Sequence, residues 1–154
     1  MWKLLKLLMF GEEIKQSGWF KQDHNLERFM NDEKIPLELV KARLKYSESR
    51  VVSPDRCLYG DIDQGIINEF GQVVLVYTKR RNTKRLDEKD RVQLSAYAWI
   101  LKQRGQKVAS YGFVRLVSGR YSRKVDYVKV ALMQGGEITR LINEYQYQDS
   151  KLIA

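Results

Sequence analysis

The stretch VVLVYTKRR, residues 73–81, decides the fold of this chain. Successive side chains of a β-strand point to opposite faces of its sheet, so alternate residues of the stretch share a face. From Val73 to Val76 both faces are apolar, which is typical of a central strand covered on both sides. Lys79 stands at the far end, where the core opens to solvent. The stretch therefore predicts a central strand with a cationic end.

The residues before this strand predict a hairpin. The run CLYGDIDQGII alternates between polar and apolar residues before it becomes apolar, as a strand does. Gly71 follows in EFGQ, a sequence with turn chemistry. Residues 57–79 are therefore expected to form two antiparallel strands joined by a short turn.

The residues after it predict a helix, DEKDRVQLSAYAWILKQR, residues 87–104. Asp87 is placed to cap this helix, and acidic residues fill its first turn. Lys102 and Arg104 lie in its last turn, and Gly105 follows as a terminator.

Weaker patterns complete the chain, which is long enough for one domain and too short for two ordinary ones. The order of elements predicts an α/β or α+β domain on a mixed central sheet flanked by helices, with a helical part over 1–50 and the core over 51–154. The further elements expected are short helices at 24–31 and 36–46, a polar linker at 47–56, strands near 107–117 and 123–131, and a final helix from about 136.

Composition favours a soluble protein with a polyanionic partner. Hydrophobic residues make up 44% of the chain and charged residues 31%, which excludes a disordered protein. The 28 Lys and Arg residues outnumber the 19 Asp and Glu residues, giving a net charge of +9. This excess favours nucleic acid first and an anionic membrane surface second, although solubility alone also explains it.

The single cysteine, Cys57, limits the metal chemistry. One cysteine forms no disulfide within the chain and cannot hold an iron–sulfur cluster. A reducing compartment, and so a cytoplasmic location, is expected.

The segment MWKLLKLLMF, residues 1–10, has three interpretations. It is too short to span a bilayer, and no small-residue cleavage site follows it. It is either a first helix packed on the core, a docking segment for a partner protein, or an interfacial membrane anchor. The first of these is the expected one.

Two aspartates in the first strand of the hairpin are candidate site residues. Asp61 and Asp63 share a face of that strand, where carboxylates are unusual. The hairpin can bring Asp63 near Lys79. The two then form either a salt bridge or a site in which a carboxylate holds a divalent metal and the lysine stabilises phosphate charge.

The helix 87–104 adds a polar stripe. Gln93 and Tyr97 lie four residues apart on one face, with Asp90 one turn earlier. The stripe is either an exposed polar surface or part of the same site.

Together these pieces resemble the PD-(D/E)XK nuclease superfamily, most closely the branch of the RecB nuclease domain and the CRISPR-associated RecB-like exonucleases. The order GDID, hairpin, strand-end lysine and QLSAY covers residues 55–130. The resemblance implies a restriction-endonuclease-like core that binds Mg²⁺ or Mn²⁺ and hydrolyses phosphodiester bonds in DNA. The roles that it implies are catalytic for Asp63, Lys79, Gln93 and Tyr97, and metal-binding for Asp63 and for the upstream His24.

The chain departs from this family at Tyr77. The family motif places Glu or Asp two residues before the lysine, whereas the triplet here is Tyr77-Thr78-Lys79. Neutral tyrosine is a poor ligand for Mg²⁺, which prefers carboxylate and water oxygens. The site is therefore either degenerate or supplied with an acid from elsewhere. The candidates for that acid are Asp61, Glu69, Glu88 and Asp90. Many RecB-like exonucleases also hold a four-cysteine iron–sulfur cluster, for which this chain lacks the ligands.

Two cationic runs flank the candidate site. The first, KRRNTKR at 79–85, joins the strand to the helix, and the second surrounds the turn of the later hairpin. Dense cations suit phosphate contacts, and an interleaved aromatic such as Tyr121 suits stacking on unpaired bases. The alternative is a solvated loop. The residues expected to bind nucleic acid, with weak sequence preference, are Lys79, Arg80, Arg81, Lys84, Arg85, Arg115, Arg120, Arg123 and Lys124.

The sequence leaves three functions open. The first is a nucleic-acid-binding protein with a degenerate nuclease site, which holds DNA ends or single strands, as a subunit for an active partner. The second is an active Mg²⁺- or Mn²⁺-dependent deoxyribonuclease with a relocated acid. The third, which residues 1–10 and the net charge favour, is a membrane-surface or structural interaction module.

Overall fold

The computed structural model describes residues 34–40, 42–54, 58–80, 85–119 and 124–153, with side chains up to residue 144. The helix expected at 24–31 and the segment 1–10 lie outside these residues. The described elements are α3 (Leu37–Val40), β1 (Arg43–Val52), β2 (Tyr59–Ile67), β3 (Val73–Arg80), α4 (Glu88–Gln103), β4 (Tyr111–Ser118), β5 (Lys124–Ala131) and α5 (Gly135–Ile153).

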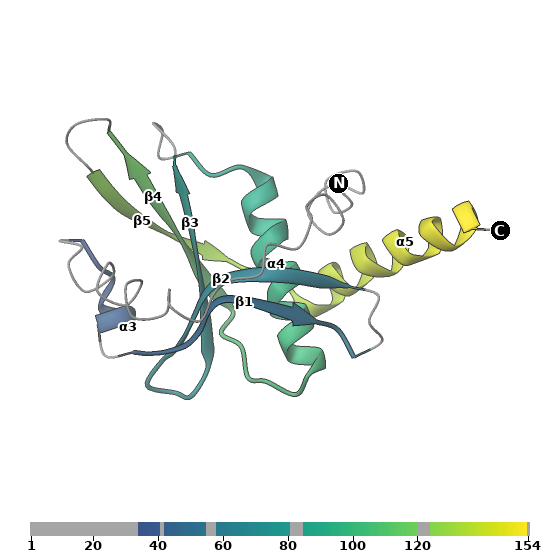
Figure 1. Cartoon of the computed structure of the whole chain (residues 1–154), viewed down its shortest axis with the longest axis horizontal. Coiled ribbons are helices and arrows are strands. Elements are labelled where there is room, and N and C mark those ends of the chain that lie inside the picture. The colour runs from purple at the N-terminus through teal and green to yellow at the C-terminus, as the bar shows by residue number, and fades with distance from the viewer. Residues whose placement is uncertain (1–33, 41, 55–57, 81–84, 120–123, 154) are drawn as a thin grey trace.

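The strands form one mixed sheet in the order β1-β2-β3-β4-β5, which confirms the expected fold class and places β3 at the centre (Figure 1). The pair β3–β4 is parallel, and the other three pairs are antiparallel. Because parallel neighbours need a crossover, α4 connects β3 to β4. The mixed α+β sheet is therefore built around the stretch that begins at Val73.

The apolar half of β3 belongs to both faces of the sheet. Val73 and Leu75 are buried in a large cluster together with residues of α4 and α5. Val74 and Val76 face the other way, into a smaller cluster that contains Leu39 of α3. The sequence-based prediction of a central strand covered on both sides is confirmed.

Helix α4 is buried along most of its length, and its ends follow the expected signals. The backbone N–H of Asp87 donates to Oδ2 of Asp90 at 3.1 Å, which caps the first turn. Gly105 ends the helix with φ +80°, a conformation that glycine adopts without strain. The indole N–H of Trp99 donates to Thr139 of α5 at 3.1 Å, so α5 packs on α4.

The predicted helix over 36–46 is wrong beyond Val40. From Arg43 to Val52 the chain forms β1, so the expected linker at 47–56 and the expected start of the core at 51 are also wrong in this region. The reason is tertiary: β1 pairs antiparallel with β2 along its length, and this pairing overrides local helix propensity.

Segment 34–40 is held against β5, the edge strand on the opposite side of the sheet from β1. Lys34 binds Asp126 of β5 at 3.1 Å, and Lys129 of β5 binds Glu38 at 3.1 Å. Leu39 is buried in the cluster beneath it. No helix in the described part of the chain is long and apolar enough to cross a membrane.

Candidate functional site

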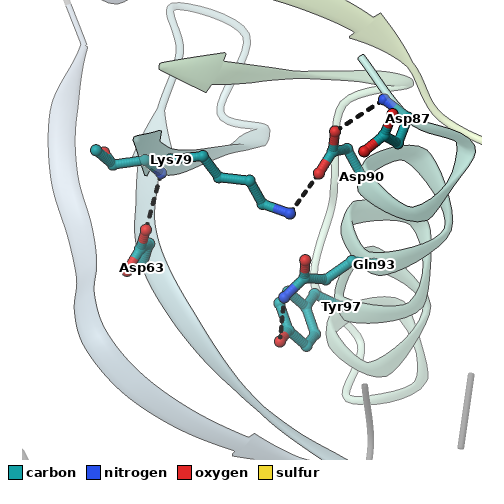
Figure 2. A network of polar contacts seen from close by, with 7 residues as sticks. Asp63, Lys79, Asp87, Asp90, Gln93 and Tyr97 are labelled. Atoms are coloured by element: carbon teal, nitrogen blue, oxygen red, sulfur yellow. Dashed lines mark hydrogen bonds and ion pairs between the residues drawn. The ribbon is translucent and has the colours of Figure 1, made fainter. Parts of the chain in front are cut away.

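The candidate site lies where β2 and β3 separate. The register between these strands runs from Ile67–Val73 to Gln64–Val76. One residue further along β2 and two residues further along β3, Oδ2 of Asp63 accepts a hydrogen bond of 2.8 Å from the backbone N–H of Thr78 (Figure 2). A side-chain carboxylate thus takes the place of the next backbone hydrogen bond between β2 and β3.

Burial is the main influence on Asp63. Its pKa is raised above the usual value of 3.8, chiefly by desolvation. The hydrogen bond from Thr78 and the charge of Lys79 oppose this rise, and the charge of Glu48 adds to it. The charge of Lys79 acts on Asp63, but the ion-pair partner of Lys79 is a different carboxylate.

The ion pair of the site joins Lys79 to Asp90. The Nζ of Lys79 binds Oδ1 of Asp90, whose other oxygen accepts the Asp87 N–H (Figure 2). The Asp90 side chain is 0% exposed and that of Lys79 is 17% exposed. A charge this deeply buried requires a partner, because an unpaired carboxylate would be strongly destabilising. The pair connects the end of β3 to the first turn of α4.

The polar stripe of α4 faces the sheet, so the alternative of an exposed polar surface is wrong. Nε2 of Gln93 donates to the hydroxyl of Tyr97 at 3.1 Å, and both residues are buried. Burial raises the pKa of Tyr97 to about 12, while the Gln93 hydrogen bond lowers it and nearby Tyr77, Asp61 and Asp63 raise it. Tyr97 is therefore a neutral phenol at physiological pH.

Tyr97 approaches β2 so closely that Gly60 is required there. A Cβ added to Gly60 would lie 2.1 Å from Cε1 of Tyr97. Any side chain at this position would have to displace the ring. The glycine of GDID and the tyrosine of QLSAY are thus one packing contact, a relation that the sequence analysis missed.

Tyr77 occupies the position at which the resembled family carries an acid. Its ring centroid lies 6.4 Å from that of Tyr97. The ammonium of Lys79 lies 5.2 Å from the Tyr77 centroid, within the range of a cation–π contact. Lys79 is therefore bordered by an aromatic ring on its own strand and by a carboxylate on α4.

The other candidate acids lie in different surroundings. Asp61 is exposed and bound to Arg50 at 3.3 Å. Glu88 lies 3.6 Å from Arg91 on the surface of α4. Glu69 is exposed in the turn between β2 and β3, at the opposite end of β3 from Lys79, so its proposed role as the relocated acid is wrong. Asp90 is the candidate that touches the lysine.

The described donors do not fit a Mg²⁺ site as they stand. Asp63 accepts from Thr78, and both Asp90 oxygens already have partners. Tyr77 offers a neutral phenol, which Mg²⁺ binds poorly. Within the described ranges, no group of three His, Cys, Asp or Glu side chains is arranged to hold a metal ion. His24 lies outside these ranges.

Three exposed basic residues lie at the same end of the sheet. Arg80 pairs with Val117 in the sheet, and Lys124 pairs with Ser118 one residue further along β4. Both cations are exposed, as is Arg85 before α4. Arg81, Lys84, Arg120, Arg123 and Tyr121 lie outside the described residues. We call Arg80, Arg85 and Lys124 the distal cations.

Arg115 does not belong to this surface. It is 3% exposed, so its expected role in phosphate contacts is wrong. In β4 it pairs with Thr78 on one side and Tyr127 on the other, three residues inside the strand end. Its nearness to the hairpin turn predicted an exposed side chain, but β4 lies between β3 and β5 in the sheet, and Arg115 is covered there.

The partnership of Lys79 with Asp90 was also missed. Asp90 had been noted in the stripe of α4 and as a candidate acid, but not as the partner of the lysine. A usable signal was present, since Asp90 precedes Gln93 by three residues and so lies on the face that proves to be buried.

Comparison with known proteins shows little. No protein-family model and no curated protein matches this chain. Among solved structures, a crystal structure of the protein SSO0001 is similar with a TM-score of 0.47 and 15% identity, over 81% of this chain. This chain spans 56% of the length of SSO0001, and a likeness this weak says nothing of function.

Proposed function

We propose that this protein binds nucleic acid through a RecB-like PD-(D/E)XK fold whose cleavage site is degenerate. Its ligand is a DNA end or a single strand. It works in the cytoplasm as a subunit of a larger DNA-processing assembly, with residues 1–10 as the contact for its partner. The observation that carries this proposal is the environment of Lys79, which has Tyr77 in the acid position of its motif and Asp90 as its partner.

The cations support the binding part of the proposal. Arg80, Arg85 and Lys124 are exposed at the end of the sheet that also holds Lys79. A net charge of +9 adds a long-range attraction for phosphate. Contacts of this kind depend on salt and carry little sequence information.

The positions of the acids support the degenerate part. A metal-dependent nuclease needs carboxylates that are available to the ion and to the attacking water. One oxygen of Asp63 accepts from Thr78, and the two oxygens of Asp90 bind Lys79 and the Asp87 N–H. Both aspartates therefore hold the fold together at this point.

One observation favours the second candidate function, an active Mg²⁺- or Mn²⁺-dependent deoxyribonuclease. Asp90 is a carboxylate in direct contact with the motif lysine, and it comes from a different element than the family acid. An acid supplied in this way would have to exchange its lysine contact for the metal.

A cleavage assay separates the two candidates. Labelled single-stranded and double-stranded DNA would be incubated with the protein and Mg²⁺ or Mn²⁺, beside Asp63→Ala and Lys79→Ala, and binding would be measured on the same samples. We expect DNA binding by the unmodified protein and no cleavage above the background of the variants. Metal-dependent cleavage that both substitutions abolish would overturn the degenerate site in favour of the nuclease.

The assay needs a control for folding, because both substitutions affect buried contacts. Circular dichroism and a urea titration of each variant provide it. Asp61→Ala is the matched control on β2, since Asp61 is an exposed carboxylate two residues from Asp63. We expect this variant to bind DNA like the unmodified protein.

A further inference from the structure

The Lys79–Asp90 pair has a consequence for how the proposed site meets DNA. The ammonium of Lys79 comes from the part of β3 that follows its last pair with β2, yet it is bound to a fully buried carboxylate. The lysine side chain is partly exposed at 17% and has four rotatable carbon–carbon bonds. It can therefore exchange one anionic partner for another without movement of the strand.

The Asp90 carboxylate offers Lys79 an anionic oxygen, as a DNA phosphate would. A carboxylate and a phosphate both offer an anionic oxygen to an ammonium group and form charge-assisted hydrogen bonds with it. Asp90 is itself fixed by the Asp87 N–H, so its oxygen stays in place in the free protein (Figure 2). The two anions would compete for one cation.

We propose that Asp90 is an internal competitor for phosphate, which withholds Lys79 from DNA and limits the affinity of the site. This inference rests on the proposed function, since it assumes that DNA meets the distal end of β3. Asp90 acts through Lys79 and is in this sense a positioning residue. Loss of its charge should release Lys79 and add one phosphate contact to those of the distal cations.

A double-mutant cycle tests this with four proteins: the unmodified chain, Asp90→Asn, Lys79→Met, and the double variant. Asparagine keeps an oxygen that can accept the Asp87 N–H, so the helix cap is retained. Affinity for a fluorescent single-stranded oligonucleotide would be measured by anisotropy across a series of salt concentrations.

One released cation predicts a defined change. Asp90→Asn should bind about three- to tenfold more tightly near 0.1 M salt, and its log–log salt slope should steepen by about 0.7 on single strands. The double variant should return to the affinity of the unmodified protein. A gain that persists in the double variant would overturn the proposal, because it would not pass through Lys79.

Asp87→Asn is the matched control. It changes the net charge by the same amount, one turn of helix earlier, and asparagine is an equally good cap. We expect its affinity to stay within about twofold of the unmodified protein, because exposed charges act weakly at this salt concentration. Equal gains in Asp87→Asn and Asp90→Asn would overturn the proposal in favour of general electrostatics.

A spectroscopic measurement guards against a variant that fails to fold. Nitrogen-detected NMR of lysine ammonium groups should show a protected signal in the unmodified protein that is absent from the double variant. This signal should persist in Asp87→Asn and disappear in Asp90→Asn. Its absence from the unmodified protein would overturn the proposal. Failure of the proposed function has a different signature, namely that none of the proteins binds DNA in a salt-dependent way.

Discussion

The two halves of strand β3 differ in how they are paired and in what they carry. From Val73 to Val76 the strand pairs with β2, and Val73 also bonds to the segment before β4 through Lys107 and Ala109. From Tyr77 to Arg80 it pairs with β4. On the β2 side of this half, the Asp63 carboxylate accepts the Thr78 N–H in place of a backbone carbonyl. The first half is fully buried and the second is partly exposed.

The comparison separates the half of the strand that stabilises the sheet from the half that carries the proposed binding site. The buried half anchors the sheet through apolar contacts with both layers of helix. The distal half holds polar groups that face Asp90, Asp63 and solvent. The proposed binding site thus lies where regular pairing with β2 ends, and changes in the two halves should have separable effects.

The largest effect is expected from the buried half. Leu75→Ala removes a fully buried side chain and should lower the free energy of unfolding by about 2–5 kcal/mol, because a cavity remains in the large cluster. Urea denaturation measures this. Phe70→Ala, in the exposed turn before β3, is the control and should change it by less than about 0.5 kcal/mol. Equal losses would mean that the core does not centre on β3.

The next effect concerns the contact of β2 with α4. Gly60→Ala should lower the free energy of unfolding by about 1–3 kcal/mol, because its Cβ would overlap the Tyr97 ring. In the background of Tyr97→Ala the same change should cost far less, since the ring is gone. Additive costs in the double variant would show that this contact is not the reason for the glycine.

At the distal half, Tyr77→Glu places an acid where the proposed nuclease-like motif would have one. A carboxylate on the face of Lys79 and near Asp63 should create affinity for Mn²⁺, seen as stabilisation by about 1.4 kcal/mol at about ten times the dissociation constant. Thermal denaturation with and without Mn²⁺ measures it, and Tyr77→Gln is the uncharged control. No difference between the two variants would count against the assignment of Tyr77 to the motif.

The smallest effect is a change in pH dependence. Burial raises the pKa of Asp63 above 3.8, so the folded chain holds this proton more tightly than the unfolded chain. The stability that this group contributes is therefore full below that pH and is lost as the pH rises through the raised value. Asp63→Asn removes the titration.

Urea titrations between about pH 3 and about pH 7 would detect this. The free energy of unfolding of Asp63→Asn, relative to that of the unmodified protein, should rise with pH across this window. A difference that stays constant or falls would show that Asp63 is not desolvated as described.

Local patterns in the sequence predicted the middle of the fold well. The hairpin, α4 with its cap at Asp87, and the central place of β3 follow from alternation, turn residues and capping residues that act over short distances. The β1 strand could not be predicted in this way. Its polar sequence, RLKYSESRVV, becomes a strand through its pairing with β2.

The candidate site was predicted only in part, again because local patterns describe single elements and not the contacts between them. Spacing on one strand or one helix placed Lys79 beside Tyr77, and Gln93 beside Tyr97. The contact of Lys79 with Asp90 joins two elements and depends on how α4 packs, which no local pattern encodes. Arg115 was misplaced because its burial depends on the neighbours of β4 in the sheet.

The central claim is that DNA meets the distal end of β3. It is tested most directly by removing three positive charges from each of two places in the chain. One variant replaces the distal cations Arg80, Arg85 and Lys124 with glutamine. Its partner replaces three exposed cations at and just beyond the C-terminal end of α4, Lys102, Arg104 and Lys107, the last of which lies in the segment that bonds to the start of β3.

Affinity for a single-stranded oligonucleotide would be measured by anisotropy at several salt concentrations. The distal variant should lose about a hundredfold in affinity near 0.1 M salt, and its salt slope should flatten by about 2. The variant at the end of α4 should lose less than about threefold, since its charges act only at a distance. Equal losses in the two variants, or a larger loss in the variant at the end of α4, would contradict the account.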